Sequence, residues 1–182
     1  MQSWAITNKP NAGPYHNLAY CHVLSSKHIN RTERFELLEE HQLSVAGSVP
    51  SIDWELFGSI LTGSKGTPGY GADLENYEVK SATEGSSFEY QYHLHGGISK
   101  LDEDMKVDHI FISYSKDYEH VTVRLVKGED LATEFESWRA GLLENYSGEA
   151  PRQRYRKSIA FGLIQELGQI IVQIEDGVLV ER

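Results

Sequence analysis

Cysteine is almost absent from this chain of 182 residues, in which Cys21 is the only one. A single thiol excludes an intramolecular disulfide framework and a cysteine-rich zinc module. Long apolar runs are absent too, since no stretch approaches the roughly 18 apolar residues of a membrane span. The first residues also lack the basic start and apolar stretch of a secretory signal. We therefore expect a cytoplasmic protein with no membrane partner.

Positive charge is scarce as well. The chain has 17 Lys and Arg against 27 Asp and Glu, a formal net charge of −10. That balance argues against a general nucleic-acid coat protein, because phosphate contacts need a basic face. One basic strip stands out, formed by Arg152, Arg154, Arg156 and Lys157. Alternation on a strand places its three arginines on one face, where they suit guanine edges and phosphates. The alternative is a charged, solvated strand start.

The remaining composition is that of a globular protein, and its length fits one domain. Periodicity and turn residues predict helices over 30–41, 51–62, 98–106 and 130–146, and strands over 77–82, 87–95, 109–113, 120–126, 155–164, 169–174 and 178–180. A long glycine-rich turn follows the second helix. This order indicates a single domain of the α/β (α+β) class, 1–182.

Four of these segments carry specific expectations. Asn30 is expected to cap the first helix, with Phe35, Leu37 and Leu38 on its apolar face. The second helix is expected to bury Ile52, Leu56, Ile60 and Leu61, and the helix over 130–146 to bury Leu131, Phe135, Trp138 and Leu142. The strand over 87–95 alternates between an apolar face (Phe88, Tyr90, Tyr92, Leu94) and a polar face (Glu89, Gln91, His93, His95).

The segment that carries chemistry follows the glycine-rich turn. Glu78 and Lys80 lie two residues apart on the predicted strand, so their side chains share a face, and Asp73 can reach them from the turn. Two converging carboxylates form an oxygen-rich site suited to Mg²⁺, with the backbone carbonyl of Val79 as a third ligand. A lysine beside that ion can orient an attacking water and stabilise charge on a phosphate. This set is the smallest that performs metal-assisted phosphodiester hydrolysis.

Interpretations without a catalytic role stay open for these residues. Asp73, Glu78 and Lys80 could form an ordinary ion pair on an exposed strand. A second acid-x-Lys match, Asp104 to Lys106, lies in a helical pattern where positions i and i+2 do not share a face, so it is set aside. Glu55, on the helix before the turn, is a further candidate for the metal site.

The polar face of the strand over 87–95 has its own alternatives. Gln91, His93 and His95 could be the wet side of a half-buried sheet. A His-x-His pair could also bind zinc, but no third ligand stands at a convincing spacing. Histidine and glutamine can equally read base edges in the DNA major groove, which admits a two-stranded ribbon.

The Asp…Glu-x-Lys element resembles the PD-(D/E)XK nuclease superfamily, and its surroundings resemble the PvuII type of restriction endonuclease. The turn Gly71-Ala72-Asp73, the strand Tyr77–Ser81 and the histidine-rich segment Gln91–His95 occur in the order of that family. A helix with Glu129-Asp130-Leu131, Phe135 and Trp138 follows, so the similarity covers roughly residues 70–168. The turn between Asp73 and Glu78 is shorter here, residues 1–50 show no clear match, and the family's asparagines are replaced around Pro151.

The resemblance implies a restriction-endonuclease-like fold, with a central mixed sheet flanked by helices. It also implies a type II restriction endonuclease that requires Mg²⁺, cuts a specific double-stranded DNA sequence and is paired with a DNA methyltransferase. A palindromic target matches a homodimer. Residues 1–62 are the expected dimerisation part, and residues 63–182 the catalytic and DNA-recognition part. The competing functions are a repair or structure-specific nuclease and a non-catalytic DNA- or protein-binding module.

Overall fold

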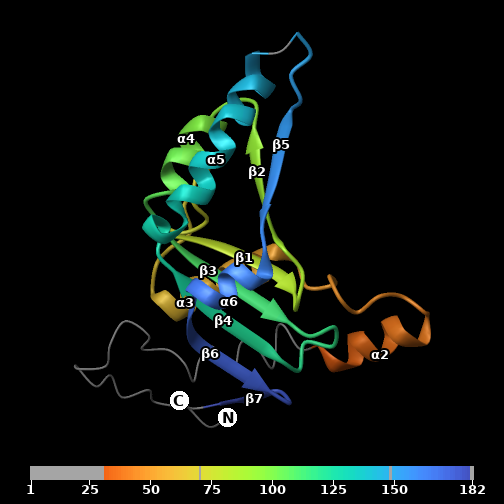
Figure 1. Cartoon of the computed structure of the whole chain (residues 1–182). Helices are drawn as coiled ribbons and strands as arrows, with labels where there is room; N and C mark the ends of the chain where they lie inside the picture. The colour runs from red at the N-terminus through yellow and green to blue at the C-terminus, as the bar shows by residue number, and fades with distance from the viewer. Residues whose placement is uncertain (1–30, 70, 148, 181–182) are drawn as a thin grey trace, which may run out of the picture.

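A five-stranded mixed sheet lies at the centre of the molecule (Figure 1). Our computed structural model describes residues 31–69, 71–147 and 149–180. In the order of the sheet, the strands are β1 (Tyr77–Thr83), β3 (Asp108–Tyr114), β4 (Val121–Val126), β6 (Gln169–Glu175) and β7 (Val178–Leu179). Strand β1 runs parallel to β3, and the other neighbours are antiparallel. The predicted central mixed sheet flanked by helices is confirmed.

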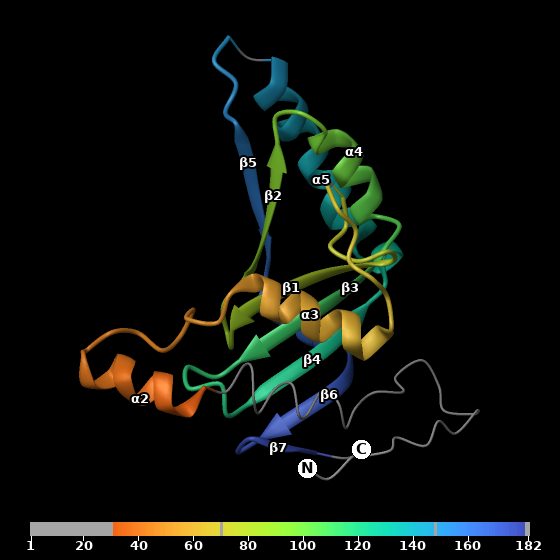
Figure 2. The same cartoon turned by 180° about the vertical axis from the view of Figure 1, so that it is seen from behind.

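Helices cover both faces of this sheet. Helix α3 (Ser51–Thr62) crosses one face (Figure 2), and α6 (Phe161–Leu167) lies on the other (Figure 1). Helices α4 (Gly97–Asp104) and α5 (Gly128–Ser147) pack against each other beyond the edge formed by β1. Helix α2 (Thr32–Glu40) stands to the side of the sheet. Among the described residues, no helix is long and apolar enough to cross a bilayer.

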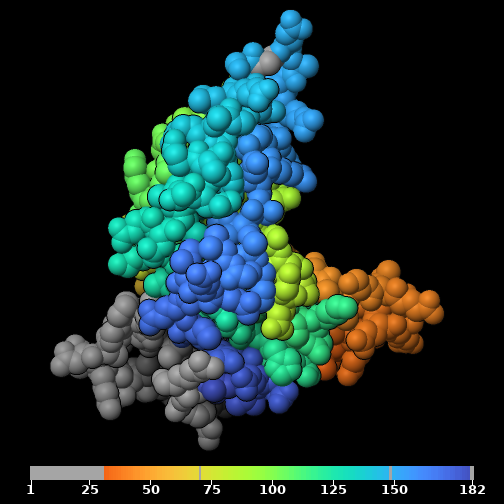
Figure 3. Space-filling view, viewed as in Figure 1, coloured from red at the N-terminus to blue at the C-terminus, as the bar shows by residue number. Residues whose placement is uncertain are grey.

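A separate two-stranded ribbon accompanies α4 and α5. Its strands, β2 (Phe88–His93) and β5 (Arg154–Ile159), are antiparallel and pair with each other rather than with the central sheet. Together with α5, the ribbon projects from the body of the molecule (Figure 3). The projection gives the ribbon one face against α5 and one face toward solvent.

Two apolar clusters divide the interior between the two faces of the sheet. On the α3 face, Trp54 and Phe57 pack on Ile110 and Ile112 of β3. On the opposite face, the ribbon and α5 enclose a cluster whose largest members are Phe88, Tyr90, Tyr92, Phe111, Phe135 and Trp138. Strand β3 serves both clusters because successive side chains point to opposite faces.

The longest periodic segments fold as predicted. Helix α5 buries all four expected side chains, Leu131, Phe135, Trp138 and Leu142. Strand β2 alternates between buried and exposed residues along its whole length. It ends at His93, however, so His95 lies in the following turn and not on the strand. Asn30 and Cys21 lie outside the described residues.

The prediction for α3 was right for Leu61, which is buried, and for Ile60, which packs partly buried against the core, but it was wrong for Ile52 and Leu56. Ile52 is 61% exposed and Leu56 is 47% exposed, whereas Trp54, Phe57 and Leu61 are buried. The two sets form competing stripes with the same helical period, so periodicity alone cannot choose between them. Aromatic side chains bury the larger area, which favours the stripe that contains Trp54 and Phe57.

The predicted strand over 155–164 was also wrong in its second half. Strand β5 ends at Ile159, and the apolar residues after it belong to α6, which begins at Phe161. A short apolar run does not distinguish a strand from a buried helical turn. At its other end, β5 begins at Arg154, so Arg152 lies in the loop before the strand and does not share a strand face with Arg154 and Arg156.

Candidate active site

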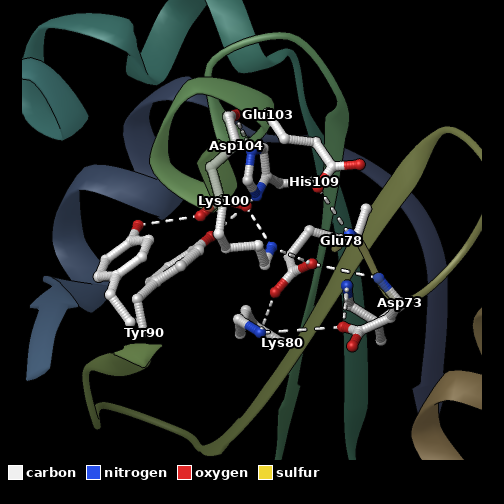
Figure 4. Close-up of polar contacts among 11 residues, drawn as sticks. Asp73, Glu78, Lys80, Tyr90, Lys100, Glu103, Asp104 and His109 are labelled. Carbon is white, nitrogen blue, oxygen red and sulfur yellow. Dashed lines mark hydrogen bonds and ion pairs between the residues drawn. The ribbon is translucent and has the colours of Figure 1, made fainter. Parts of the chain in front are cut away.

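Strand β1 presents its functional side chains on the face that carries α4 and the ribbon. In register with β3, Glu78 lies beside His109 and Lys80 beside Phe111, both of which face the ribbon cluster. Val79 points the other way, into the α3 cluster. The shared face predicted for Glu78 and Lys80 is therefore what the fold produces, and Figure 4 shows Glu78 between Lys80 and Lys100 of α4.

Asp73 reaches this face because the chain doubles back before β1. Leu74 and Tyr77 form an antiparallel bridge that brings Asp73 next to the start of the strand. The backbone N–H of Val79 donates to Asp73 Oδ2 at 3.0 Å, and the N–H of Asp73 donates to Glu78 Oε2 at 3.2 Å. The structure thus brings together the three residues that the sequence singled out.

Two lysines share the carboxylate of Glu78, which is only 2% exposed. Lys80 donates to Glu78 Oε1, and its Nζ lies 3.8 Å from Asp73 Oδ2. Lys100, from α4, donates to Glu78 Oε2 at 2.7 Å and also to Asp104 Oδ1. With three carboxylates and two ammonium groups, the cluster has a formal charge of −1.

The electrostatics keep most of this cluster charged. Burial opposes ionisation of Glu78, but the ammonium groups of Lys80 and Lys100 outweigh burial and lower its pKa. Burial likewise disfavours the charged form of Lys100, yet Glu78 and Asp104 raise its pKa. For Asp73, burial and the neighbouring Glu78 raise the pKa, although Lys80 opposes them. Burial raises the pKa of Asp104 to about 6 against the opposing charge of Lys100.

Helix α4 supplies residues that the sequence interpretation missed. Lys100 and Asp104 are one helical turn apart and face the same carboxylate cluster. Glu103 accepts the N–H of Ala72 at 3.1 Å and so holds the turn that carries Asp73. A Cβ at Gly71 would lie 3.1 Å from Glu103 Oε2, which favours glycine there. The acid-x-Lys match at 104–106 was rightly set aside, since Lys106 is exposed, but Asp104 itself belongs to the site.

A buried histidine, His109, links the backbone of Asp104 to the side chain of Tyr90 beside the cluster. His109 Nε2 lies 2.7 Å from the backbone oxygen of Asp104, and Nδ1 lies 2.8 Å from the hydroxyl of Tyr90. A carbonyl oxygen only accepts, so Nε2 carries the proton and Nδ1 accepts from Tyr90. Burial lowers the pKa of His109 to about 4, which keeps it neutral near pH 7. The Tyr90 ring in turn lies 5.1 Å from Lys80 Nζ.

The carboxylate cluster opens into a cavity of about 400 Å³ whose far wall is the ribbon. Its lining combines Asp73, Glu78 and Lys80 with Gln91, His93 and His95. Two sets of residues that were predicted for separate reasons, one for catalysis and one for DNA contact, therefore border one space.

The ribbon places the predicted DNA-contact residues across from one another. Gln91 pairs with Arg156, and His93 pairs with Arg154, so all four share the exposed face. Arg156 also lies 3.8 Å from Glu89, an exposed pair. Lys157 pairs with buried Tyr90 and therefore points to the other face. Arg152 precedes the strand, where Asn145 hydrogen-bonds to its backbone. Of the four predicted cations, only Arg154 and Arg156 join Gln91 and His93.

The residues present fit a divalent cation. The carboxylates of Asp73 and Glu78 already surround one cation, the ammonium group of Lys80. Strand β1 is a sheet edge, and the Val79 N–H points outward to Asp73. The N–H and C=O of a strand residue point to the same side, so the Val79 carbonyl also leaves β1 on its open edge, the side from which Asp73 approaches. Among the described residues, no group of three or more His, Cys, Asp or Glu side chains is arranged to hold a metal ion, so the two carboxylates would share the ion with other oxygen ligands such as the Val79 carbonyl and water.

Glu55 lies within electrostatic reach of the same site from α3. Burial and the charge of Asp73 raise the pKa of Glu55, and Lys80 opposes them. No hydrogen bond joins Glu55 to the described cluster residues, so its place is beside the three central residues rather than among them.

Comparison of the sequence with protein-family models and with curated proteins found no match. The geometry and chemistry of the site are therefore the basis for assigning a function.

Proposed function

We propose that this protein is a Mg²⁺-dependent endonuclease that cuts double-stranded DNA at a specific sequence, as a type II restriction endonuclease does. One observation carries the proposal. A single cavity of about 400 Å³ is bordered on one side by Asp73, Glu78 and Lys80 and on the other by Gln91 and His93 of the ribbon. Groups suited to hydrolysis and groups able to read base edges thus face the same cavity.

The chemistry follows from the charges of the site. Asp73, Glu78 and the carbonyl of Val79 would hold Mg²⁺, which supplies Lewis-acid stabilisation of charge on the phosphate. Lys80 lies beside both carboxylates, close enough to orient an attacking water and to stabilise the negative charge of the transition state. The two lysines keep the carboxylate of Glu78 ionised although burial opposes ionisation, and the surrounding contacts hold it in one position.

The ribbon supports binding of duplex DNA. A two-stranded ribbon fits the major groove, where arginine recognises guanine and glutamine recognises adenine. Gln91, His93, Arg154 and Arg156 stand on one exposed face, and the ribbon projects from the body of the molecule (Figure 3). His95 and Arg152, at the open end of the ribbon, can extend this contact. Lys157 faces the other way and suits at most the DNA backbone.

A homodimer agrees with this function, because one site cuts one strand and a palindromic target has two-fold symmetry. Residues 1–62 are the proposed dimerisation part. Two apolar side chains, Ile52 and Leu56, are exposed one turn apart on α3 and support a contact there. Such an enzyme would work with a DNA methyltransferase that protects the host's own copies of the target, and it would act in the cytoplasm.

Cleavage of DNA of known sequence tests the proposal. The purified protein is incubated with several plasmids in Mg²⁺, with a parallel series in EDTA. Discrete fragments that need Mg²⁺ are expected, and their ends define the target. A smear, or cleavage only at unusual DNA structures, would favour a repair nuclease. DNA that stays intact under all Mg²⁺ conditions would contradict the proposal and favour a binding module.

A further inference from the structure

The two lysines that share Glu78 have different partners. Lys80 contacts Glu78 Oε1 and Asp73 Oδ2, and these are the two carboxylates proposed to hold Mg²⁺. Lys100 contacts Glu78 Oε2 and Asp104, and Asp104 is not a proposed metal ligand. The side chains are similarly exposed, at 20% and 17%, so solvent access does not separate them. Their difference lies in what each ammonium group holds.

Glu78 Oε2 is already well supplied with hydrogen-bond donors. It accepts from Lys100 at 2.7 Å and from the backbone N–H of Asp73 at 3.2 Å. Lys100 is fixed in turn by Asp104, whose other oxygen accepts the hydroxyl of Tyr92 at 2.9 Å. Figure 4 shows this chain of contacts running from α4 to β1. Oε2 is thus anchored from a second element.

Glu78 Oε1 has a replaceable partner. It accepts from Lys80, which is carried by the edge strand β1 and lines the cavity. A divalent cation attracts two carboxylates more strongly than a single ammonium charge does at the same position. Cation binding between Asp73 and Glu78 would therefore displace Lys80 and leave Lys100 in place.

We infer that Lys100 is a positioning residue that fixes Glu78 through Oε2, while Lys80 occupies the cation position of the metal-free protein and leaves it when a divalent cation binds. This inference rests on the proposed Mg²⁺ site of the nuclease. It assigns different tasks to two lysines that bind the same carboxylate.

Calorimetric titration with Mg²⁺, without DNA, separates these tasks. Lys80→Met removes the competing ammonium group, so Mg²⁺ should bind by a factor of about 5 or more tighter than to the parent. The double variant Lys100→Met/Asp104→Asn removes one charge of each sign, which leaves the formal charge of the cluster unchanged. Its Mg²⁺ affinity should fall by about 10-fold or more, as for other groups that orient a metal ligand.

Controls separate positioning from damage to the fold. Asp104→Asn keeps a side-chain oxygen that can still accept the hydroxyl of Tyr92, and thermal unfolding of the metal-free variants reports any loss of structure. Lys106→Met, just beyond α4 on an exposed side chain, should leave Mg²⁺ affinity at the parent value. A purely structural role of Lys100 would lower the unfolding temperature without changing the affinity of the folded protein.

Three results would overturn the inference: a folded double variant with parent affinity, a Lys80→Met variant that binds no tighter than the parent, or no Mg²⁺ binding by either the parent or Lys80→Met. The titration needs no DNA. A protein that shows the expected affinities but leaves all plasmids intact would therefore disprove the nuclease function and retain the role of Lys100.

Discussion

Two polar cavities of similar size differ in how far they remove charged side chains from solvent. The cavity at Glu78 has a volume of about 400 Å³, and a second cavity, beside Glu84, His120 and Glu175, has about 360 Å³. At the first, Glu78 and Asp104 are almost completely removed from solvent. At the second, the pair His120–Asp176 spans 3.6 Å between side chains that are 51% and 86% exposed.

This difference separates a candidate site from an ordinary polar surface. An exposed pair contributes little to stability, whereas a buried charge is costly unless it is paired and hydrogen-bonded. Folding alone does not require a carboxylate such as Glu78 to be buried among two lysines and two further acids. Size and polarity do not distinguish the two cavities, but burial of compensated charge does.

The largest effect on stability is expected at Glu78. Glu78→Gln removes the carboxylate that both Lys80 and Lys100 contact, and breaking a buried pair from one side costs about 3–5 kcal/mol. Chemical denaturation without metal measures this loss. Glu84→Gln, in the turn just after β1 and at the second cavity, should change the free energy of unfolding by less than about 0.5 kcal/mol. Equal effects of the two substitutions would remove the contrast between the cavities.

The next largest effect concerns how the free energy of unfolding falls as the pH is lowered. The pKa of His109 is lowered from 6.5 to about 4 by burial, so the unfolded chain takes up this proton first as the pH falls. The stabilisation from neutral His109 is complete above pH 6.5 and is lost between pH 6.5 and 4, by about 3 kcal/mol in total. Asp104, whose pKa is raised, contributes in the opposite direction over part of this range.

Comparison with His109→Gln isolates that contribution. The glutamine does not titrate, so the free energy of unfolding should fall less steeply between pH 6.5 and 4 than in the parent. His120→Gln, at the exposed cavity, should stay within about 0.5 kcal/mol of the parent. Parallel curves for His109→Gln and the parent would show that His109 is not held neutral.

The smallest effect is expected on the ribbon, where side chains meet solvent. His93→Ala should reduce the preference for the target over other sequences by about 1–3 kcal/mol, as the loss of one base contact does. Lys157→Ala, on the other face, should weaken binding to all sequences equally or not at all. Competition binding with the target defined by the cleavage fragments measures both. Equal losses on target and non-target DNA for His93→Ala would assign His93 to the DNA backbone or to folding.

The sequence predicts those parts of the fold in which one period dominates. Helix α5 and strand β2 have a single apolar face each, and both were predicted with the correct buried residues. Helix α3 has two competing stripes, and the segment after Ile159 is too short to show its period. In those two places packing against the sheet, which is not visible in the local pattern, decides the outcome.

The residues of the candidate site were likewise predicted from the sequence only in part. Asp73, Glu78 and Lys80 are close in the chain, and the two-residue period of a strand brings Glu78 and Lys80 to one face. Lys100 lies 22 positions after Glu78 and reaches it only because α4 packs beside β1. Its spacing of four residues to Asp104 was the available signal, and it is common on helices. Long-range contacts of this kind need the tertiary structure.

DNA cleavage by Lys80→Met, measured beside Lys106→Met, tests the central claim most directly. Lys80 lies at the carboxylate cluster, whereas Lys106 is an exposed lysine two positions after Asp104 in the chain. With both variants folded and able to bind DNA in EDTA, Lys80→Met should cut at least about 10²–10³-fold more slowly than the parent, and Lys106→Met at the parent rate. A folded Lys80→Met protein that cuts DNA as fast as the parent would contradict the assignment of this cluster as a nuclease active site.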